Sequence, residues 1–316
     1  MYTPSPNFAK LQFCEIERFI ESALSSAGAH DADHFFAQCP AVRRFTIKTQ
    51  KHRLRHQATG AINKTSQRNR HAMHKGIYTD FLCKALPMPS EGPSNASMAS
   101  AVLSRLREDR IGRVIFTPLY CHGRSGAAGS IAHFINQRNI AFKALRPHLP
   151  HGISYTLAAE IAIVPGCFDD PDICRLMIDI SGYLPVLLPF PIYSDEVWKD
   201  INRLTYHTKY KPIFTNFDRF LIVYPFDEIK KIEKVPRAAF HFNVRSLDSK
   251  HMVKYVISLI DAGKTVVFGT GAHRVGRYET EMEPHFKLLR RYLGDNDFDA
   301  LMLSVSNFCR PPKYHH

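Results

Sequence analysis

Two glycine-rich loops carry the residue types that could do chemistry in this chain. The first, 121–129, combines a histidine, an arginine, a serine and three glycines. Its glycines would let backbone N–H groups approach an anion, and its histidine would serve as a general base. The second, 268–277, places one histidine and two arginines among further glycines. Arginines suit bidentate contacts to phosphate or carboxylate, so both loops are candidate sites for an anionic ligand.

The elements around these loops predict an α/β fold, with a mainly parallel sheet flanked by helices. Each loop follows an apolar run with the length of a buried strand, at 113–120 and 264–268. A helical pattern over 130–137 follows the first loop, and this strand–loop–helix order is typical of α/β units. Ligands of such sheets bind beyond the carboxyl ends of the strands, where both loops would lie. We also predict strands at 140–145, 184–188, 220–224, 238–244 and 300–305, and helices at 152–180, 249–262 and 283–293.

The composition changes along the chain and predicts two regions. Residues 1–95 form a helical, basic N-terminal region with a linker, because 84–101 is rich in Pro, Ser, Gly and Asn. Residues 96–316 form the α/β domain. Within the first region, 43–75 holds ten lysines and arginines and no acid.

The charge balance predicts an anionic partner. The 316 residues contain 42 Lys and Arg against 29 Asp and Glu, a net charge of +13. This charge would suit an anionic lipid, a phosphorylated acceptor or, through 43–75, a nucleic acid. Segment 43–75 is explained equally simply as a basic face that is exposed only to water. The sequence leaves the oligomeric state open.

The cysteines and the apolar runs predict the cellular location. The seven cysteines are scattered without a CxxC pair, which favours reduced thiols in a cytoplasmic protein and gives no zinc-ligand spacing, so we expect no metal site. The apolar runs fall short of the roughly 18 residues that span a bilayer. The expected protein is therefore cytoplasmic, with peripheral contact to a membrane as its closest association.

The stretch 243–274 resembles the glycerolipid (lysophospholipid) acyltransferase superfamily. In that family an arginine after a short strand precedes a helix, a buried strand and a loop of the form FPEGTR, and Arg245, Gly271 and Arg274 follow this order. An earlier HxxxxD block supplies the family's catalytic histidine. His122 stands where that block belongs, with Ala127 at the position of its aspartate.

This resemblance implies an acyltransferase-like enzyme that moves an acyl group from a thioester to a phosphate-bearing acceptor at an anionic membrane surface. It implies an acyl-thioester co-substrate and no bound cofactor. The residues that we expect at the site are His122 and Ser125 as catalytic groups, and Arg124, Arg245, Gly271, His273, Arg274 and Arg277 as substrate-binding groups.

Two other functions remain open from the sequence. The run from 114 to 126 resembles the early part of α/β-hydrolases, in which a strand ends in a His-Gly pair near the oxyanion hole, and His273 would then be the base of an esterase. Alternatively, the chain is a non-catalytic protein that binds nucleic acid or lipid through 43–75.

Overall fold

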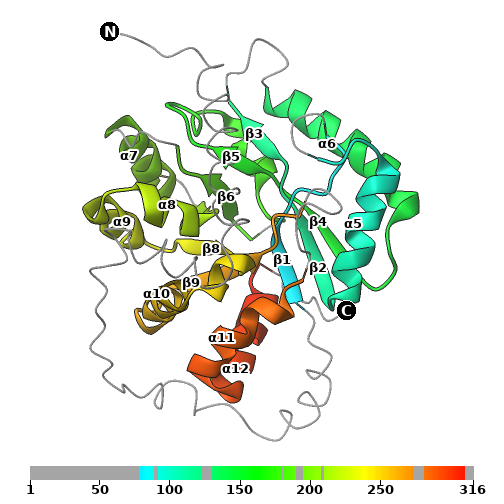
Figure 1. Ribbon diagram of the computed structural model, residues 1–316. Helices are drawn as coiled ribbons and strands as arrows, with labels where there is room; N and C mark the ends of the chain where they lie inside the picture. Colours follow the sequence, from blue (N-terminus) through cyan, green and yellow to red (C-terminus); the bar gives the residue numbers. More distant parts are fainter. Residues whose placement is uncertain are drawn as a thin grey trace, which may run out of the picture.

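The computed structural model describes residues 78–88, 92–122, 130–179, 181–189, 195–207, 210–272 and 281–309. Within these residues the chain has an α/β fold, as the sequence predicts, with parallel strands in the middle and helices around them (Figure 1). Apolar strand residues fill the core, because parallel strands that are covered on both faces must be apolar throughout.

The strands form two parallel sheets. The first sheet has the order β1-β2-β4 and the second has the order β3-β5-β6-β7-β8-β9. Every pair of neighbouring strands is parallel. The bounds are β1 Tyr78–Cys83, β2 Ile111–Phe116, β3 Leu119–Cys121, β4 Ser154–Leu157, β5 Glu160–Ala162, β6 Tyr183–Leu187, β7 Lys211–Phe214, β8 Ala239–Asn243 and β9 Thr265–Gly269.

The two sheets are joined into one ring of strands. Strand β2 runs on into β3 and β4 runs on into β5, with two residues between the members of each pair. On the other side, the segment after β9 meets the end of β1: Gly271 N donates to Leu82 O at 3.0 Å and Lys84 N donates to Ala272 O at 2.9 Å. Since all strands are parallel, their carboxyl ends open toward the same side of this ring.

Helices cover the outside of the strands. In Figure 1, α5 and α6 lie on one side, α7, α8 and α9 on the other, and α10, α11 and α12 below. Side chains of Asn95, Ser130 and Ser249 cap α5, α6 and α10 by accepting backbone N–H bonds, which fixes where these helices begin. The bounds are α5 Ala96–Glu108, α6 Ile131–Leu145, α7 Asp195–Asn202, α8 Phe217–Val223, α9 Phe226–Glu233, α10 Lys250–Asp261, α11 Glu283–Leu293 and α12 Asp295–Asn307, with a 3-10 turn, η5, at Val244–Asp248.

An aromatic cluster holds β7 and β8 against α8 and α10. Phe217 lies 4.9 Å from Phe240 and 6.1 Å from Phe242 between ring centroids. Tyr255 of α10 stacks with Phe217 at 6.5 Å and meets Phe242 edge-on at 6.2 Å. All of these rings are fully buried. Because aromatic pairs at such distances add stability beyond the area they bury, this part of the core is a rigid support for the ends of β7 and β8.

Several predicted elements are wrong. The apolar run 140–145, predicted as a strand, is the second half of α6, since its buried residues Arg138, Ala141 and Leu145 recur at helical spacing while Ile140 is 55% exposed. The runs 220–224 and 300–305, also predicted as strands, belong to α8 and α12. Short apolar runs have no periodicity long enough to distinguish a strand from a buried helix.

The stretch 152–180, predicted as helical, contains β4, β5 and a 3-10 turn at Pro171–Leu176. The predicted strands at 184–188, 238–244 and 264–268 and the helices at 249–262 and 283–293 are confirmed, because their apolar runs are bounded by clear turn residues.

The described part of the fold begins before the predicted α/β domain. Strand β1 lies N-terminal to residue 96, where we expected the domain to start, and it pairs with β2. The sheet therefore includes residues that we assigned to the N-terminal region. The basic segment 43–75 lies outside the described residues.

No helix among the described residues is long and apolar enough to span a membrane. The cysteines of this part of the chain, Cys83, Cys121, Cys167, Cys174 and Cys309, are free thiols.

Candidate functional site

Buried polar side chains gather around the carboxyl ends of β1, β7, β8 and β9, the side on which an α/β fold binds its ligands. Asp80 and His241 lie within β1 and β8, and Glu160 is the first residue of β5. Lys84, Asn216 and Thr270 follow the ends of β1, β7 and β9, and their partners come from the neighbouring strands. We call this group the carboxyl-end cluster; its members are Asp80, Lys84, Glu160, Asn216, Asp218, His241, Asn243 and Thr270.

Asp80 connects β1 to the segment after β9. Its Oδ1 accepts hydrogen bonds from Leu82 N at 3.1 Å and Thr270 N at 3.0 Å, and its Oδ2 accepts one from Thr270 Oγ1 at 2.6 Å. Burial raises the pKa of this carboxyl group, and the three hydrogen bonds oppose that shift. Since both carboxylate oxygens are engaged, Asp80 serves as a fixed link between two strands.

A buried ion pair connects β1, β5 and β7. Lys84 Nζ pairs with Glu160 Oε2, and the side chains are only 10% and 3% exposed. The other carboxylate oxygen, Oε1, accepts a hydrogen bond from Asn216 Nδ2 at 3.4 Å. Removing one partner from a buried pair leaves an uncompensated charge, which costs about 3 to 5 kcal/mol. The pair therefore fixes the position of the Glu160 carboxylate.

Asn216 has a left-handed backbone at the end of β7. Its φ is 50°, a conformation that is uncommon for residues other than glycine. Its backbone N donates to His241 Nδ1 at 3.1 Å, while its side chain reaches Glu160. Backbone strain of this kind concentrates at functional sites, where the surrounding contacts hold it in place.

His241 is a neutral imidazole in the middle of the cluster. Its Nδ1 accepts the Asn216 N–H bond, so the neutral ring carries its proton on Nε2. Burial, assisted by the charges of Arg219 and Lys84, lowers the pKa of His241 to about 3. Nε2 has no hydrogen-bond partner within the described part of the chain.

Gly269 lets β9 approach the cluster closely. A Cβ atom at this position would lie 2.5 Å from His241 Nε2, 2.8 Å from Leu82 N and 2.9 Å from Asp80 Oδ1. All three distances are shorter than real Cβ atoms tolerate. A glycine is therefore required where β9 passes between β1 and β8.

Asn243 joins the cluster to the turn after β8. Its N donates to Asp218 Oδ1 and its Nδ2 donates to Thr270 O, each at 3.1 Å. Burial raises the pKa of Asp218 to about 6, although the nearby Arg219 charge and backbone hydrogen bonds lower it. Asp218 thus changes charge close to neutral pH inside the protein.

Two of the residues predicted from the sequence lie beside Asn243. Arg245 N donates to Asn243 Oδ1 at 3.0 Å, and a Cβ on Gly271 would lie 3.3 Å from Asn243 Nδ2. Gly271 has a φ of +68°, which favours glycine there. The structure therefore brings Arg245 and Gly271 to the same end of the sheet.

The other predicted site residues are not brought together by the described structure. His122 directly follows β3, as expected, and its Nδ1 lies 3.3 Å from the Tyr120 hydroxyl. The remaining residues lie outside the described residues: Arg124, Ser125, His273, Arg274 and Arg277.

Most residues of the cluster were not predicted from the sequence. Lys84 fell within the predicted linker and Glu160 within a predicted helix. A usable signal was present, because Glu160 and His241 are each flanked by apolar residues within a short run. A polar side chain in the middle of a buried strand needs a partner, so such residues point to a polar cluster inside the fold.

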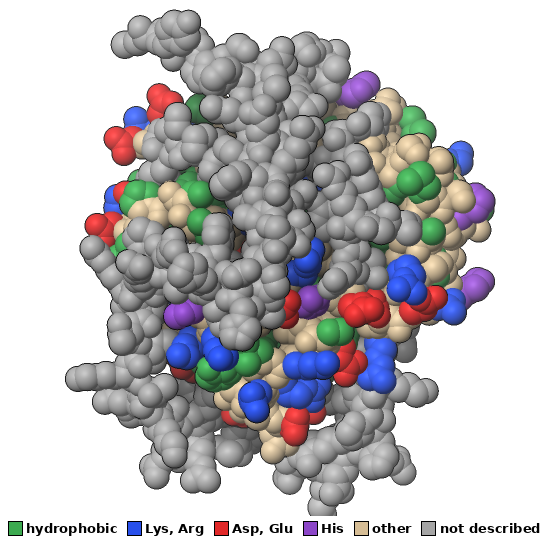
Figure 2. All heavy atoms as spheres, viewed as in Figure 1, with side chains coloured by type: hydrophobic (Ala, Val, Ile, Leu, Met, Phe, Trp, Pro, Cys, Tyr) green, Lys and Arg blue, Asp and Glu red, His purple; other side chains and the backbone are tan. Residues whose placement is uncertain are grey.

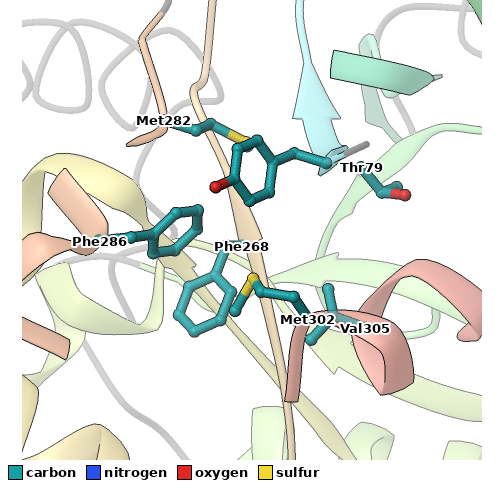
Figure 3. Close-up of a pocket in the computed structure, with 7 residues that line it drawn as sticks. Thr79, Phe268, Met282, Phe286, Met302 and Val305 are labelled. Atoms are coloured by element: carbon teal, nitrogen blue, oxygen red, sulfur yellow. The ribbon is translucent and has the colours of Figure 1, made fainter. Parts of the chain in front are cut away.

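The pocket drawn in Figure 3 contains none of the cluster residues. It lies between β1, β9, α11 and α12, where Phe268, Phe286 and Met302 turn toward one another. The rings of Phe268 and Phe286 are 5.2 Å apart. Its lining is almost entirely apolar, so it is a gap in core packing with no acid or base to use.

The exposed charges of the described part are mixed. Figure 2 shows Lys and Arg side chains interleaved with acids on the lower part of this face, where α10, α11 and α12 lie in Figure 1. Arg110 pairs with Glu283 at 3.3 Å, and Arg290 pairs with Asp295 at 3.3 Å. Exposed pairs of this kind contribute about 0 to 1 kcal/mol each. On the described part of this face, basic and acidic side chains are therefore mixed.

The comparisons with known proteins concern the fold. No family model and no curated protein matches the sequence. A solved structure described as YwqE from Bacillus subtilis and CpsB from Streptococcus pneumoniae, "unique metal-dependent tyrosine phosphatases", is 17% identical, with a TM-score of 0.53 over 73% of this chain and 94% of that chain. A histidinol phosphate phosphatase from Lactococcus lactis, solved with zinc, L-histidinol and phosphate, is 14% identical over 68% of this chain and 93% of that chain, and its TM-score of 0.38 is too low to carry an argument.

These comparisons correct the resemblance to acyltransferases. The solved structure with a TM-score of 0.53 is described as a metal-dependent tyrosine phosphatase, so an acyl-transfer enzyme of lipid metabolism at a membrane surface is the wrong expectation, and the esterase and nucleic-acid or lipid-binding alternatives fit no better. The expectation of a thioester co-substrate and no bound cofactor is corrected as well, because the phosphatases of the first structure are described as metal-dependent. The order of strand, helix, strand and loop over 243–274 recurs in any parallel α/β fold, so it could not identify one family. The fold of this chain is shared with the metal-dependent tyrosine phosphatases.

Proposed function

We propose that this protein is a phosphatase-like enzyme that acts on phosphate esters, with the carboxyl-end cluster as part of its site. One observation carries the proposal: a buried cluster of ionisable residues, with a left-handed Asn216 beside it, lies around the carboxyl ends of β1, β7, β8 and β9 in a fold shared with tyrosine phosphatases. The net charge of +13 supports an anionic substrate.

The chain supplies the groups that phosphate-ester chemistry needs. Transfer of a phosphoryl group is assisted by cations that contact its oxygens and by a residue that orients the attacking water. Glu160, fixed by two partners, is the carboxylate that we assign to the water. We assign the phosphate oxygens to Arg124, Arg274 and Arg277, which follow β3 and β9 in the sequence.

His241 is unsuited to proton transfer. A pKa of about 3 leaves it neutral near pH 7, and its Nδ1 lone pair is already used by Asn216 N. An efficient general base has a pKa near the working pH. We therefore assign His241 to holding the Asn216 backbone in position.

A metal ion fits the described residues poorly. Divalent metals need several His, Cys, Asp or Glu ligands directed at one point, and the described residues contain no group of three that could hold one. In the cluster, Lys84 already neutralises Glu160, and Asp80 uses both oxygens in hydrogen bonds. We therefore derive no reaction step through a metal.

The test is phosphate release from a phosphotyrosine peptide and from p-nitrophenyl phosphate by the full-length protein, with and without added Mn²⁺. We expect turnover by the wild type and a fall in kcat/KM of about 100-fold or more in Glu160→Gln, since loss of a group that positions the nucleophile costs this much. Arg274→Ala should raise KM for both substrates, because it would remove a contact to the phosphate.

Two controls separate a loss of catalysis from a loss of folding and from the general effect of replacing a glutamate. Circular dichroism of Glu160→Gln confirms that the variant is folded before its rate is compared. Glu233→Gln is the matched substitution outside the cluster, in α9, and should keep wild-type turnover. Absence of phosphate release from both substrates under all conditions, or equal rates in Glu160→Gln and the wild type, would refute the proposed function.

A further inference from the structure

We infer that the Lys84 ammonium is the built-in counter-cation of Glu160 and competes with divalent cations for this carboxylate. The fold is shared with metal-dependent phosphatases, yet at the strand ends this chain directs a lysine at a buried glutamate. The importance of this contact for catalysis rests on the proposed function. The contact between Lys84 and Glu160 does not depend on it.

Burial of the Glu160 carboxylate has to be compensated. A carboxylate that is 3% exposed requires a cation or several hydrogen-bond donors. Lys84 supplies the charge at Oε2, and Asn216 supplies a hydrogen bond at Oε1. Both oxygens of the carboxylate therefore have partners from β1 and β7.

The side chains near Glu160 that could bind a metal already use their lone pairs. His241 Nδ1 faces the Asn216 N–H group, so the proton of the neutral ring is on Nε2, where a metal would need a lone pair. Asp80 accepts three hydrogen bonds. Among the described residues, a divalent cation at Glu160 would thus find few ligands with a free lone pair.

Electrostatic repulsion from the Lys84 ammonium disfavours a divalent cation at Glu160. A divalent cation bound to Glu160 would lie within a few ångströms of the Lys84 ammonium, inside a site where water screens poorly. Like charges at that separation repel strongly, so either the ammonium or the metal can occupy the carboxylate. Removing the ammonium should therefore increase the affinity of the site for cations.

The first experiment titrates Mn²⁺ into four full-length proteins by isothermal titration calorimetry. They are the wild type, Lys84→Met, Glu160→Gln and the double variant Lys84→Met/Glu160→Gln. The chain has 17 histidines, and imidazole is a common ligand of divalent metals, so only binding removed by Glu160→Gln counts. In the wild type we expect no Glu160-dependent binding up to the highest Mn²⁺ concentration tested. In Lys84→Met we expect Glu160-dependent binding with a Kd at least about tenfold below that concentration, because one like charge has been removed. Lys84→Arg keeps the charge and should behave as the wild type.

Two results of this titration overturn the inference. One is a Glu160-dependent Mn²⁺ site in the wild type. The other is a Lys84→Met protein that binds Mn²⁺ no more tightly than the wild type does. A merely structural role for Lys84 predicts the second result, so the titration separates it from competition.

The second experiment measures thermal stability. Lys84→Met should lower Tm by about 6 to 12 °C, the shift expected when a buried pair loses one partner. Lys84→Met/Glu160→Met should regain at least half of that loss, because no buried charge is left unpaired. Lys231→Met is the matched control, since Lys231 also pairs with a glutamate, Glu228, but is 52% exposed, and its Tm should change little.

A double variant that folds where Lys84→Met does not would also support the inference, whereas a double variant no more stable than Lys84→Met overturns it. Neither experiment uses a phosphate ester. If the proposed function is wrong, turnover is absent while the titration and stability results are as expected. If the inference is wrong, turnover is present while the titration and stability results are not as expected.

Discussion

Replacing Asp218 by asparagine should stabilise the protein at high pH and leave its stability unchanged at low pH. Asp218 is buried at the start of α8, and its Oδ1 accepts a hydrogen bond from Asn243 N at 3.1 Å. Asparagine has the same shape and keeps an oxygen for that bond. The substitution therefore removes the ionisable group with little change in packing.

The magnitude follows from the pKa. Burial raises the pKa of Asp218 from 3.8 to about 6, so the folded state binds a proton that the unfolded state has released between these values. Stability falls as pH rises wherever the folded state binds more protons. A shift of about two units corresponds to about 3 kcal/mol, lost progressively between about pH 4 and pH 6 and absent above that range.

Urea unfolding of wild type and Asp218→Asn at pH 4, 5, 6, 7 and 8 measures this difference. Asp80, Asp200 and His241 also have shifted pKa values, but both proteins contain them, so their effects cancel in the comparison. We expect a difference near zero at pH 4 that grows to about 3 kcal/mol in favour of the variant at pH 8.

Asp261→Asn, at an exposed carboxylate, controls for the general loss of one negative charge. A difference between Asp218→Asn and the wild type that does not change with pH, or that favours the wild type at pH 8, would show that Asp218 is not a buried carboxyl with a raised pKa.

Three further predictions follow from the same structure. Gly269→Ala should lose about 3 kcal/mol of stability in urea unfolding, because its methyl group would overlap three atoms. The control Gly263→Ala meets no atom within 4 Å and should lose about 1 kcal/mol. Equal losses in the two variants would contradict the close approach of β9 to β1 and β8. Arg113→Met should cost about 3 kcal/mol and speed hydrogen exchange near the end of α12, since the buried guanidinium donates to the carbonyls of residues 308 and 309. His241 should keep a neutral, Nε2-protonated ring from pH 8 to pH 5 in side-chain ¹⁵N spectra, with its resonance identified by its loss in His241→Gln; a titration midpoint near 6.5 would contradict its burial.

The sequence was informative where a local pattern had enough length or clear ends. The helix that became α10 shows an apolar stripe between a serine cap and a glycine, and β9 is an apolar run directly after that glycine. These features are set by residues close together in the chain. The α/β class follows from them, because alternating strands and helices pack in few ways.

Local pattern was misleading where burial comes from distant segments. The run 220–224, which includes the second half of α8, has the pattern of a strand because all of its residues are apolar, and only packing against β8 explains why this part of a short helix is so apolar. The acyltransferase resemblance failed for a related reason. It compared the order of elements, which many α/β folds share, and it could not compare their positions in space.

The sequence by itself determined the α/β class, most strands of the second half of the chain, and the strand ends as the place to look for a site. Only the tertiary structure decided which polar residues meet there. Lys84 and Glu160 are 76 residues apart, and Asp80 and Thr270 are 190 apart. Each of these pairs forms because the ring of parallel strands brings β1 beside β9 and near β5 and β7, and the cost of leaving a buried charge or polar group without a partner then holds the pairs together.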